Sequence, residues 1–527
     1  MVYGLLQEVL GMFKLGSKKL RESVFYFLLP LFGGVLMGLT TSPVEAWPLA
    51  WVALVPLWVA VKREGVKDSK FFAFIPFFWA FGYHGLALFW ITGIHPMTWM
   101  GVPWLASLAI AFFCWVFITL WGVFLLTIWA FCLRFIIRKN PKVSGGLWVL
   151  IGTALWCFLE AVWSSGPLWW TSLSYTQSPH NLVILQLGKI GGPTAITAAI
   201  VGVNGLIAEG LLKGEKIAQM RRDFVMAGVL LVSLHLVGLS IYLQPVAKPA
   251  ETALKVGIIQ GNIPNTIKLF VDGKNRALEN YTKGYEELAE RGVDAILTPE
   301  GALPFYFKDL KNSAIFKAIL DKKVVVWLGA FGEQGLSYTN SLFTVMGNGE
   351  VFSRYNKVKL VPLGEYIPFE SVLGKLIDRL SPLDAHMAAG SSNQVFDTPF
   401  GRAIMGICYE SAFAEHFRRQ AAQGGQFILT ASNNAHYAET MPAQHHAQDV
   451  MRAIETDRWA VRSTNTGYSG IVDPHGNTIW LSGINTNEVY SGIIYRRNSE
   501  TLYVRWGDWL VPVLFGLAAI GWVFNRR

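Results

Sequence analysis

Charged residues are scarce in this sequence, and their scarcity argues against a soluble protein. Only 15% of the 527 residues are charged, whereas 52% are hydrophobic. A soluble protein has about 25% charged residues, so we expect a membrane protein. The formal net charge of +9 arises from short Lys and Arg clusters between apolar runs. Such clusters are typical of membrane topology signals and not of a basic nucleic-acid-binding face, so no nucleic-acid partner is expected.

Cysteine is also rare, which limits both disulfide and metal chemistry. The chain has four cysteines, of which Cys114, Cys132 and Cys157 lie inside apolar runs and are interpreted as small buried hydrophobic residues. No Cys/His spacing indicates a metal site. Cys408 is the only cysteine in residues 250–500, which excludes a disulfide bond within that segment. A lone thiol there is a candidate reactive group, with a buried structural cysteine as the alternative.

Eight apolar runs approach the roughly 20 residues that a membrane-spanning helix requires. They cover residues 25–41, 47–61, 71–93, 104–137, 146–164, 189–212, 224–243 and 508–524. Lys and Arg occur at both ends of the chain and in every second loop, and are absent from the first, third and fifth loops. By the positive-inside rule both termini are cytoplasmic, and residues 250–500 lie on the opposite, periplasmic side. The predicted domains are a membrane domain at 1–249, an external domain at 250–500 and a final span at 501–527.

The external segment has the composition of a soluble α/β domain. Short apolar, β-branched runs such as LKVGIIQ, VVVWLGA and QFILTAS alternate with helix-compatible polar stretches such as ENYTKGYEELAERG. This alternation indicates buried strands separated by helices. A segment of about 240 residues is long enough to bury a hydrophobic core of its own.

Three reactive side chains in this segment each follow a strand-like run. Glu300 comes directly after AILTP, Lys357 after SRYN and Cys408 after AIMGI. In α/β domains, reactive groups collect where strands end. Taken singly, each residue has an ordinary alternative, because a Glu after a strand is often a helix N-terminal acid and a Lys is usually solvated.

The order of these three residues resembles the nitrilase superfamily, whose members carry Glu, Lys and Cys at the strand ends of an αββα sandwich. The chain is most similar to the membrane-embedded branch of that superfamily, the apolipoprotein N-acyltransferase family, over nearly its whole length. The resemblance is carried by residues 260–264, 299–304, 355–357, 360–368, 408–410 and 462–467, with 90–95 and 173–177 in the membrane part. It implies a nitrilase-like αββα domain attached to a polytopic α-helical membrane domain of about eight spans.

The chemistry of acyl transfer suits the three residues. Cys408 is the expected nucleophile, Glu300 the group that takes and returns the thiol proton, and Lys357 the cation that stabilises the oxyanion. The resemblance implies supporting roles, in positioning and proton transfer or near the acyl group, for Glu365, Glu410 and Tyr409. A structural salt bridge is the alternative for the two carboxylates.

Candidate substrate-binding residues lie in both parts of the chain. Aromatic residues at helix ends suit a lipid entrance because Trp and Tyr favour the membrane interface, and an ordinary aromatic belt is the alternative. The candidates are Trp90, His95, Trp170, Tyr175, Gln260 and Asn262.

Three positions depart from the family pattern. Leu269 and His436 stand where a Trp is common, and Trp169 stands where a Pro is common. These departures leave the acceptor pocket and the donor preference open. His436 is either an additional acid/base group or an ordinary hydrogen-bonded histidine.

The resemblance implies that a fatty acyl chain passes from a membrane phospholipid to the N-terminal α-amine of an S-diacylglyceryl-cysteine in an apolipoprotein, through a thioester on Cys408. No metal or organic cofactor is expected. The implied location is the bacterial inner membrane, with phospholipid, diacylated apolipoprotein and the bilayer as partners. Two alternatives stay open: a membrane-tethered carbon–nitrogen hydrolase of amidase or nitrilase type with the same three residues, and a non-enzymatic lipid transporter or receptor.

Overall fold

Apolar helices make up the N-terminal half of the protein. The structure is a computed structural model that describes residues 24–214, 216–362, 364–366, 387–435, 437 and 439–526. Among these residues, four helices are long and apolar enough to cross a membrane. They are α7 (Trp104–Lys139), α8 (Gly145–Ser165), α10 (Gly188–Lys213) and α11 (Ile217–Tyr242).

Shorter helices occupy the other four predicted spans, so the predicted count of eight is not confirmed. The predicted span 47–61, for example, is divided into three short helices, with Pro48 and Pro56 in their first turns. Proline lacks the N–H that a continuing helix would use, so it favours a helix start. The shorter elements are η2 (Val24–Leu28), α3 (Leu29–Gly38), η3 (Trp47–Leu49), α4 (Ala50–Ala53), α5 (Val55–Gly65), α6 (Phe74–Ala87), η4 (Phe89–Ile94), η5 (Thr98–Met100), α9 (Leu182–Leu185) and α19 (Leu510–Arg526).

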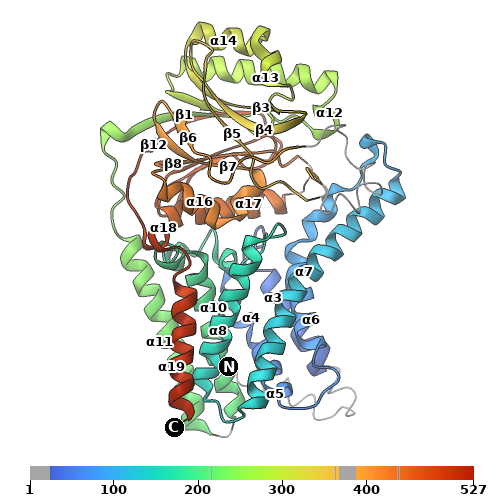
Figure 1. Cartoon of the computed structure of the whole chain (residues 1–527), viewed down its shortest axis with the longest axis vertical. Coiled ribbons are helices and arrows are strands. Elements are labelled where there is room, and N and C mark those ends of the chain that lie inside the picture. The colour runs from blue at the N-terminus through green and yellow to red at the C-terminus, as the bar shows by residue number, and fades with distance from the viewer. Residues whose placement is uncertain are drawn as a thin grey trace.

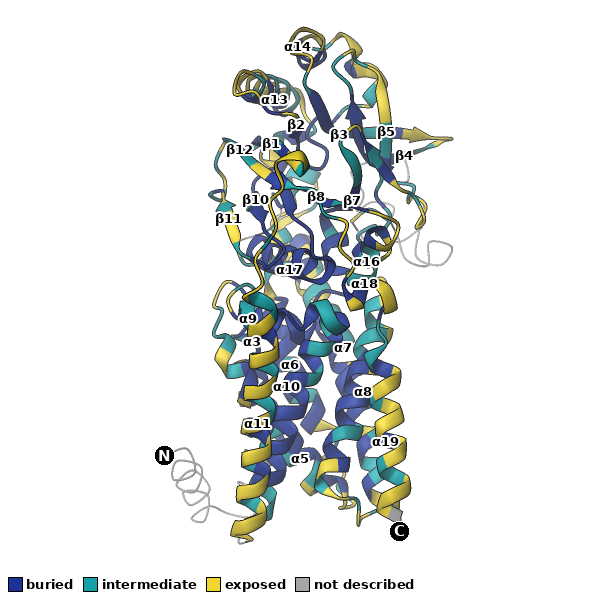
Figure 2. Ribbon diagram, turned by 90° about the vertical axis from the view of Figure 1, so that its left-hand side faces the viewer, coloured by how far each residue is buried: buried dark blue, intermediate teal, exposed yellow. Residues whose placement is uncertain are grey.

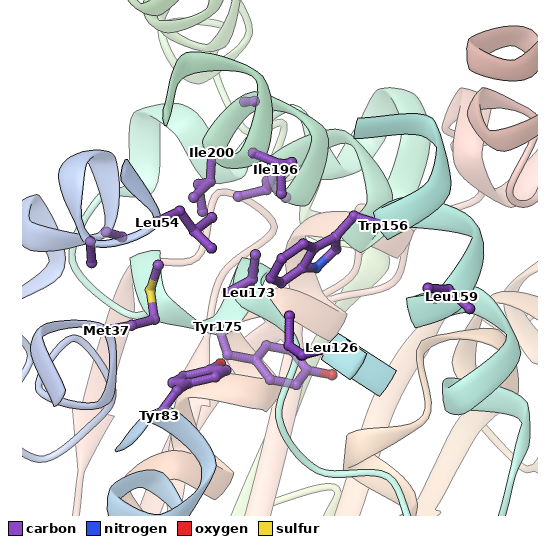
Figure 3. Close-up of a cluster of buried hydrophobic side chains, with 14 of the residues drawn as sticks. Met37, Leu54, Tyr83, Leu126, Trp156, Leu159, Leu173, Tyr175, Ile196 and Ile200 are labelled. Carbon is purple, nitrogen blue, oxygen red and sulfur yellow. The ribbon is translucent and has the colours of Figure 1, made fainter. Parts of the chain in front are cut away.

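The helices pack around a buried apolar core and expose apolar side chains outward. Most residues of α10 are buried, whereas α11 and α19 leave their outer faces exposed (Figure 2). On α11 the exposed side chains include Val225, Val229 and Leu236, a surface that lipid would solvate better than water. Figure 3 shows part of the core, where side chains from α3 to α10 converge on Leu173 and Tyr175 of η6 (Leu173–Gln177).

Helix α7 is longer than a bilayer requires. Its 36 residues extend about 54 Å at 1.5 Å per residue, compared with about 30 Å for the hydrocarbon core. Its N-terminal part therefore continues past the neighbouring helices. In Figure 1 this part rises, together with η4 and η5, beside the C-terminal half of the molecule.

The C-terminal half is an αββα sandwich, which confirms the predicted fold class. Among the described residues, two six-stranded sheets run in the orders β12-β1-β2-β3-β4-β5 and β11-β10-β9-β8-β7-β6. Helices α13 and α14 cover the outer face of the first sheet, and α16 and α17 cover the second sheet on the side of the membrane helices (Figure 1). The second sheet and α17 therefore lie between the first sheet and the membrane half.

The strands are β1 (Ala253–Gln260), β2 (Ala295–Leu297), β3 (Val325–Gln334), β4 (Ser337–Val345), β5 (Val351–Asn356), β6 (Phe396–Thr398), β7 (Gly401–Ile407), β8 (Phe427–Ser432), β9 (Ala460–Thr464), β10 (Gly470–Val472), β11 (Thr478–Leu481) and β12 (Glu488–Tyr495). The helices are η7 (Ala250–Thr252), α12 (Asn265–Lys268), α13 (Val271–Glu290), η8 (Phe307–Asn312), α14 (Ala314–Lys322), η9 (Cys408–Ala412), α16 (Ala414–Ala422), α17 (Thr440–Thr456) and α18 (Leu502–Trp506).

Each sheet contains three neighbouring parallel strands. Strands β1, β2 and β3 pair in parallel in the first sheet, as do β7, β8 and β9 in the second. The carboxyl ends of parallel strands meet at one edge of a sheet. The predicted domain boundaries at 249/250 and 500/501 fall between α11 and β1 and between β12 and α18, and they stay a prediction.

Candidate active site

Strand ends bring the three predicted catalytic side chains together between the two sheets. Glu300 follows β2, Lys357 directly follows β5, and Cys408 directly follows β7. The Glu300 loop runs close to β3, because a Cβ at Gly329 would lie 1.9 Å from the carbonyl oxygen of Pro299. Only glycine allows this approach. All three reactive side chains are buried.

Cys408 lies in a strained turn between β7 and η9. Its φ angle is 52°, in the left-handed region that residues other than glycine rarely adopt. Nε2 of His445 on α17 donates to the Cys408 carbonyl oxygen at 2.7 Å and holds the turn. Burial lowers the pKa of His445 to about 3, so the imidazole is neutral and keeps its one proton on Nε2 for this bond. Strained residues of this kind collect at active sites.

The Glu300 carboxylate accepts hydrogen bonds at both oxygens. Oε1 accepts from Nζ of Lys357 at 2.9 Å and from Nδ2 of Asn340 at 2.7 Å. Oε2 accepts from the backbone N–H of Asn433 at 2.9 Å, and the nearby Cys408 thiol helps to lower the pKa of this carboxyl group. Burial raises the pKa of Glu300, but the Lys357 ammonium, with smaller contributions from Lys268 and Cys408, outweighs burial and leaves the pKa below its ordinary value. An ionised acceptor beside the thiol is the position of a general base.

Lys357 bridges two carboxylates. Its Nζ donates to Oε1 of Glu365 at 2.7 Å as well as to Glu300. Burial lowers the pKa of Lys357, but the two carboxylates raise it well above its ordinary value, so the amine is a permanent cation. Burial raises the pKa of Glu365 above its ordinary value, and the Glu300 charge adds to this rise while Lys357 opposes it. A fixed buried cation is well suited to stabilising an oxyanion.

The Cys408 thiol is protonated in this environment. Burial raises its pKa to about 12, and the charge of Glu300 contributes to the rise. The thiolate is the reactive form of cysteine. The sulfur therefore needs a base at the moment of attack, and Glu300 is the carboxylate whose charge acts most strongly on it.

Glu410 ties the ends of two strands together. Its Oε1 accepts from the backbone N–H groups of Val358 at 2.6 Å and Lys359 at 3.0 Å, next to Lys357. Its Oε2 accepts from the N–H of Ile407 at 2.7 Å, next to Cys408, and from the Tyr355 hydroxyl at 3.0 Å. The carboxylate thus fixes the end of β5 against the end of β7, which sets the distance between the lysine and the nucleophile.

Aromatic side chains from both halves of the protein surround the nucleophile turn. Trp170 stacks on Tyr409 with ring centroids 6.2 Å apart, and its centroid lies 5.5 Å from that of His445. Trp90 packs against Trp170 at 5.0 Å. The Tyr409 hydroxyl donates to the carbonyl oxygen of Pro167 at 2.7 Å. Three of the residues predicted from the sequence, Trp90, Trp170 and Tyr409, therefore form one apolar wall next to Cys408.

Gln444 of α17 connects this wall to the membrane half. Its Oε1 accepts from Nε1 of Trp170 at 2.7 Å and from Nε1 of Trp90 at 3.1 Å. Its Nε2 donates to the carbonyl oxygens of Ala87 at 2.9 Å and Ser42 at 3.2 Å. All of its side-chain hydrogen-bonding groups are used, so one residue fixes α17 to α6 and to the turn after α3.

Two further predicted residues lie on the membrane half at different distances from the site. The Tyr175 hydroxyl donates to the carbonyl oxygen of Ala412, at the end of η9, at 3.0 Å. His95 lies between η4 and η5, where its Nδ1 bonds to Oγ of Ser107 at 2.9 Å and its ring meets that of Trp104. The described contacts of His95 do not join it to the catalytic three.

Gln260 and Asn262 hold the end of β1 in place. Gln260 is wholly buried, where its Oε1 accepts from three serine and threonine hydroxyls and its Nε2 donates to the loop at 483–486. Asn262 has a φ of 51° and donates from Nδ2 to the carbonyl oxygen of Asn485 at 2.7 Å. Protein groups occupy the Gln260 amide and Nδ2 of Asn262, which gives both residues a structural position.

Two of the three departures from the family pattern, Leu269 and Trp169, fall within the described residues, and both lie close to the site. Leu269 caps the short helix α12, directly after the buried Lys268. Trp169 is buried, and its backbone N–H donates to the Tyr409 hydroxyl at 3.0 Å. His436 lies outside the described residues.

Five residues that were not predicted from the sequence contact Glu300, Cys408 or the aromatic wall of Trp90, Trp170 and Tyr409. They are Lys268, Asn340, Asn433, His445 and Gln444. Lys268 lies four residues after the 260–264 segment, so its place beside a family-like segment was a usable signal. The other four have no local pattern that distinguishes them from ordinary polar residues.

Both halves of the chain match known protein families. Residues 33–206 match the apolipoprotein N-acyltransferase N-terminal domain, and residues 255–496 match the carbon-nitrogen hydrolase family. The apolipoprotein N-acyltransferase of Nostoc sp. is 59% identical over 93% of this chain and 97% of its own length. That of Synechocystis sp. is 48% identical over 93% and 98%, and that of Geobacter metallireducens is 28% identical over 92% of each chain.

Among solved structures, the chain is similar to an amidase of the nitrilase superfamily from Nesterenkonia, with a TM-score of 0.37 and 17% identity over 49% of this chain and 95% of that one. The relatives in sequence are far closer, and they match the membrane helices as well as the sandwich. On these grounds the chain belongs to the apolipoprotein N-acyltransferase family, an acyltransferase family whose members carry a carbon–nitrogen hydrolase domain.

Proposed function

We propose that this chain transfers a fatty acyl chain from a membrane phospholipid to the N-terminal α-amine of an S-diacylglyceryl-cysteine in an apolipoprotein. The observation that carries the proposal is the buried group of Glu300, Lys357 and Cys408 beside an aromatic wall that the membrane half supplies. An acyl chain arriving along that wall stays in apolar surroundings up to the nucleophile. The names of the curated relatives support the acceptor class.

In the first half-reaction, the Cys408 sulfur attacks the ester carbonyl of the phospholipid. Glu300 takes the thiol proton as the C–S bond forms, because the thiol alone does not ionise near neutral pH. The oxyanion of the tetrahedral intermediate is stabilised by Nζ of Lys357. Collapse of this intermediate breaks the ester C–O bond, and Glu300 returns its proton to the leaving oxygen. The products are a Cys408 thioester and a lysophospholipid.

In the second half-reaction, the acceptor amine attacks the thioester carbonyl. Lys357 again stabilises the oxyanion, and Glu300 takes a proton from the attacking nitrogen and passes it to the departing sulfur. The amide product leaves and the free thiol is restored. The two substrates use one nucleophile in turn, so we expect ping-pong kinetics.

The proposal includes a location. Residues 250–500 lie on the periplasmic side of a bacterial inner membrane, residues 1–249 and 501–527 are membrane domains, and both termini are cytoplasmic. The alternation of Lys and Arg between loops supports this orientation, and the four long apolar helices support the membrane setting.

The test is an activity assay with the full chain in lipid nanodiscs. Phospholipid with a labelled acyl chain and a synthetic diacylated lipopeptide are incubated with the wild type and with Cys408→Ala. We expect label in an amide at the lipopeptide N-terminus with the wild type, and a loss of at least about 100-fold with Cys408→Ala. If the lipopeptide stays unlabelled while a small amide is hydrolysed in a Cys408-dependent way, the membrane-tethered hydrolase replaces the acyltransferase.

A further inference from the structure

A second lysine lies beside the site, at the rim of the aromatic wall. Lys359 is partly buried, and its ammonium group lies over the Phe413 ring, 4.8 Å from the ring centroid. Among the described residues, no carboxylate lies within ion-pair distance of this ammonium group and no acceptor takes a hydrogen bond from it, in contrast to Lys357 with its two carboxylates. An ammonium group has three donor hydrogens, so Lys359 retains its capacity to bind an anion.

The negative charge that acts on Lys359 is already used by the protein. Both oxygens of Glu410 are occupied, and one of their four donors is the backbone N–H of Lys359 at 3.0 Å. Burial lowers the pKa of Lys359, the Glu410 charge opposes this fall, and the Arg419 charge on α16 adds to it. Arg418 and Arg419 share the single carboxylate of Glu415. An anion bound at Lys359 would therefore enter surroundings that lack one.

The Phe413 ring connects Lys359 to the nucleophile turn. Phe413 is 3% exposed, and its ring meets the Tyr409 ring edge to face with centroids 5.0 Å apart. Tyr409 directly follows Cys408 and stacks on Trp170 of the membrane half. Phe413 directly precedes α16, which covers the second sheet on the side of the membrane helices (Figure 1). The Lys359 ammonium group thus lies beside the wall, on the side of the sandwich that faces the membrane half.

A phospholipid donor carries a negative charge close to its reacting ester. The phosphate diester and the ester that Cys408 attacks are attached to the same short glycerol backbone. While the acyl chain lies along the aromatic wall, the phosphate therefore stays near the nucleophile, at the rim of the wall. Burying such an anion without a cation or hydrogen-bond donors is costly. This requirement for a cation rests on the proposed function.

We propose that Lys359 binds the phosphate group of the donor phospholipid. Its Nζ donates to a non-bridging phosphate oxygen while the ester carbonyl lies between Cys408 and Lys357, and lysine suits this task as a point charge. The Phe413 ring holds the ammonium group in place before the lipid arrives. No bond of the phosphate forms or breaks, and the lysophospholipid leaves with its phosphate intact. Lys357 stabilises the charge that the reaction develops, whereas Lys359 recognises the charge that the donor brings.

Two variants and two acyl donors test this role. Lys359→Met removes the charge, and we expect Cys408 acylation from phosphatidylglycerol to fall at least about tenfold. Lys359→Arg keeps a cation and should stay within about threefold of the wild type. p-Nitrophenyl palmitate is a neutral acyl donor without phosphate, so acylation from it should be unchanged in both variants. Lys283→Met on the exposed surface of α13 is the control for loss of a lysine.

The measurement is the rate of acyl-adduct formation on the full chain, followed by intact-protein mass spectrometry. The chain is held in nanodiscs of ether phospholipid, which has no ester to transfer, and each donor is added as a minor component. The ether lipid presents phosphate to the protein in both assays. A variant that only weakens contact with the bilayer would therefore slow acylation from both donors equally.

Inorganic phosphate at the donor's own concentration should leave the wild-type rate unchanged, because the free anion lacks the acyl chains that hold the donor at the wall. Inhibition by inorganic phosphate that disappears in Lys359→Met would assign the site to the free anion and overturn the proposal. An unchanged phospholipid rate in Lys359→Met would also overturn it, as would an equal fall with both donors or an equal fall in Lys359→Arg. A wild type that forms no adduct from phospholipid would overturn the proposed function itself, before any Lys359 variant is compared.

Discussion

Two carboxylates share one lysine at the site, and their pKa values move in opposite directions. The pKa of Glu300 lies below its ordinary value and that of Glu365 above it, although Lys357 contacts both. Glu300 has additional donors in Asn340 and Asn433 that stabilise its charged form. Opposite shifts of this kind separate the roles of paired carboxylates. We therefore propose that Glu300 is the ionised group that receives the thiol proton, and that Glu365 orients the ammonium group between them.

Replacement of Glu410 by Gln should disable the site without unfolding the domain. Glu410 accepts four hydrogen bonds, two of them at each oxygen. A Gln side chain must turn an NH₂ group toward N–H donors on one side, so the ends of β5 and β7 would separate. We expect Glu410→Gln to slow thioester formation at least about 100-fold. The control is Glu415→Gln, whose side chain is 42% exposed on α16 and pairs with Arg418.

Thioester formation is followed by mass spectrometry, and folding by thermal unfolding in the same detergent. An acylation rate in Glu410→Gln within threefold of that in Glu415→Gln would contradict the positioning role of Glu410.

The convergence of the three proposed catalytic residues could be predicted because each has a recognisable local sequence pattern. Glu300, Lys357 and Cys408 each follow an apolar, strand-like run, and their order along the chain matches a known superfamily. The residues that form hydrogen bonds with them have no such local sequence pattern. Asn340 bonds to Glu300 across 40 residues of sequence, and His445 bonds to Cys408 across 37. These atoms come together only through strand pairing and the packing of α17. A single sequence contains no pattern that predicts such contacts.

At the scale of elements, α17 connects the Cys408 turn to the membrane half. Its sequence is polar enough to suggest a helix with one solvated face, yet every residue from Met441 to Thr456 is buried. The second sheet covers one side, and α10 and η6 of the membrane half pack against the other. On its membrane side, Gln444 bonds to two tryptophans of the membrane half. The sequence pattern predicts the helix but not what buries it.

Replacement of Gln444 by Leu should loosen α17 from the membrane half. The change leaves the Nε1 groups of Trp90 and Trp170 without an acceptor and two backbone carbonyl groups without a donor. Each buried unpaired group destabilises by about 1–3 kcal/mol. We expect a lower unfolding temperature and a fall in phospholipid-dependent acylation of about tenfold, because the aromatic wall shifts relative to Cys408.

The matched control is Gln423→Leu at the exposed end of α16, which should leave both quantities unchanged. Equal unfolding temperatures and acylation rates for the two variants would show that Gln444 does not hold the two halves together.

Membrane spans were predicted well where a helix is long, although α10 has non-helical backbone at Gly191 and Gly192. The predicted runs 104–137, 146–164, 189–212 and 224–243 correspond to α7, α8, α10 and α11. Hydropathy reports composition but not continuity, so it did not reveal that 47–61 is broken at prolines or that 71–93 changes from α6 to η4.

At the scale of the whole molecule, the sandwich stands at one end of a helix bundle with a lipid-compatible surface (Figure 2). The proposed orientation can be tested with matched cysteine substitutions labelled by a membrane-impermeant maleimide in spheroplasts. Lys283→Cys lies on the exposed surface of α13, and Lys142→Cys lies in the exposed turn between α7 and α8. We expect Lys283→Cys to be labelled in intact spheroplasts and Lys142→Cys only after permeabilisation. The reverse pattern would contradict a periplasmic catalytic domain.

Intact-protein mass spectrometry of the purified chain, incubated with phospholipid and no acceptor, tests most directly whether Cys408 carries the acyl group. We predict a single acyl adduct on the wild type that neutral hydroxylamine removes and that is absent from Cys408→Ala. An adduct that persists in Cys408→Ala, or a wild type that stays unmodified with every common phospholipid, would contradict acyl transfer through a Cys408 thioester.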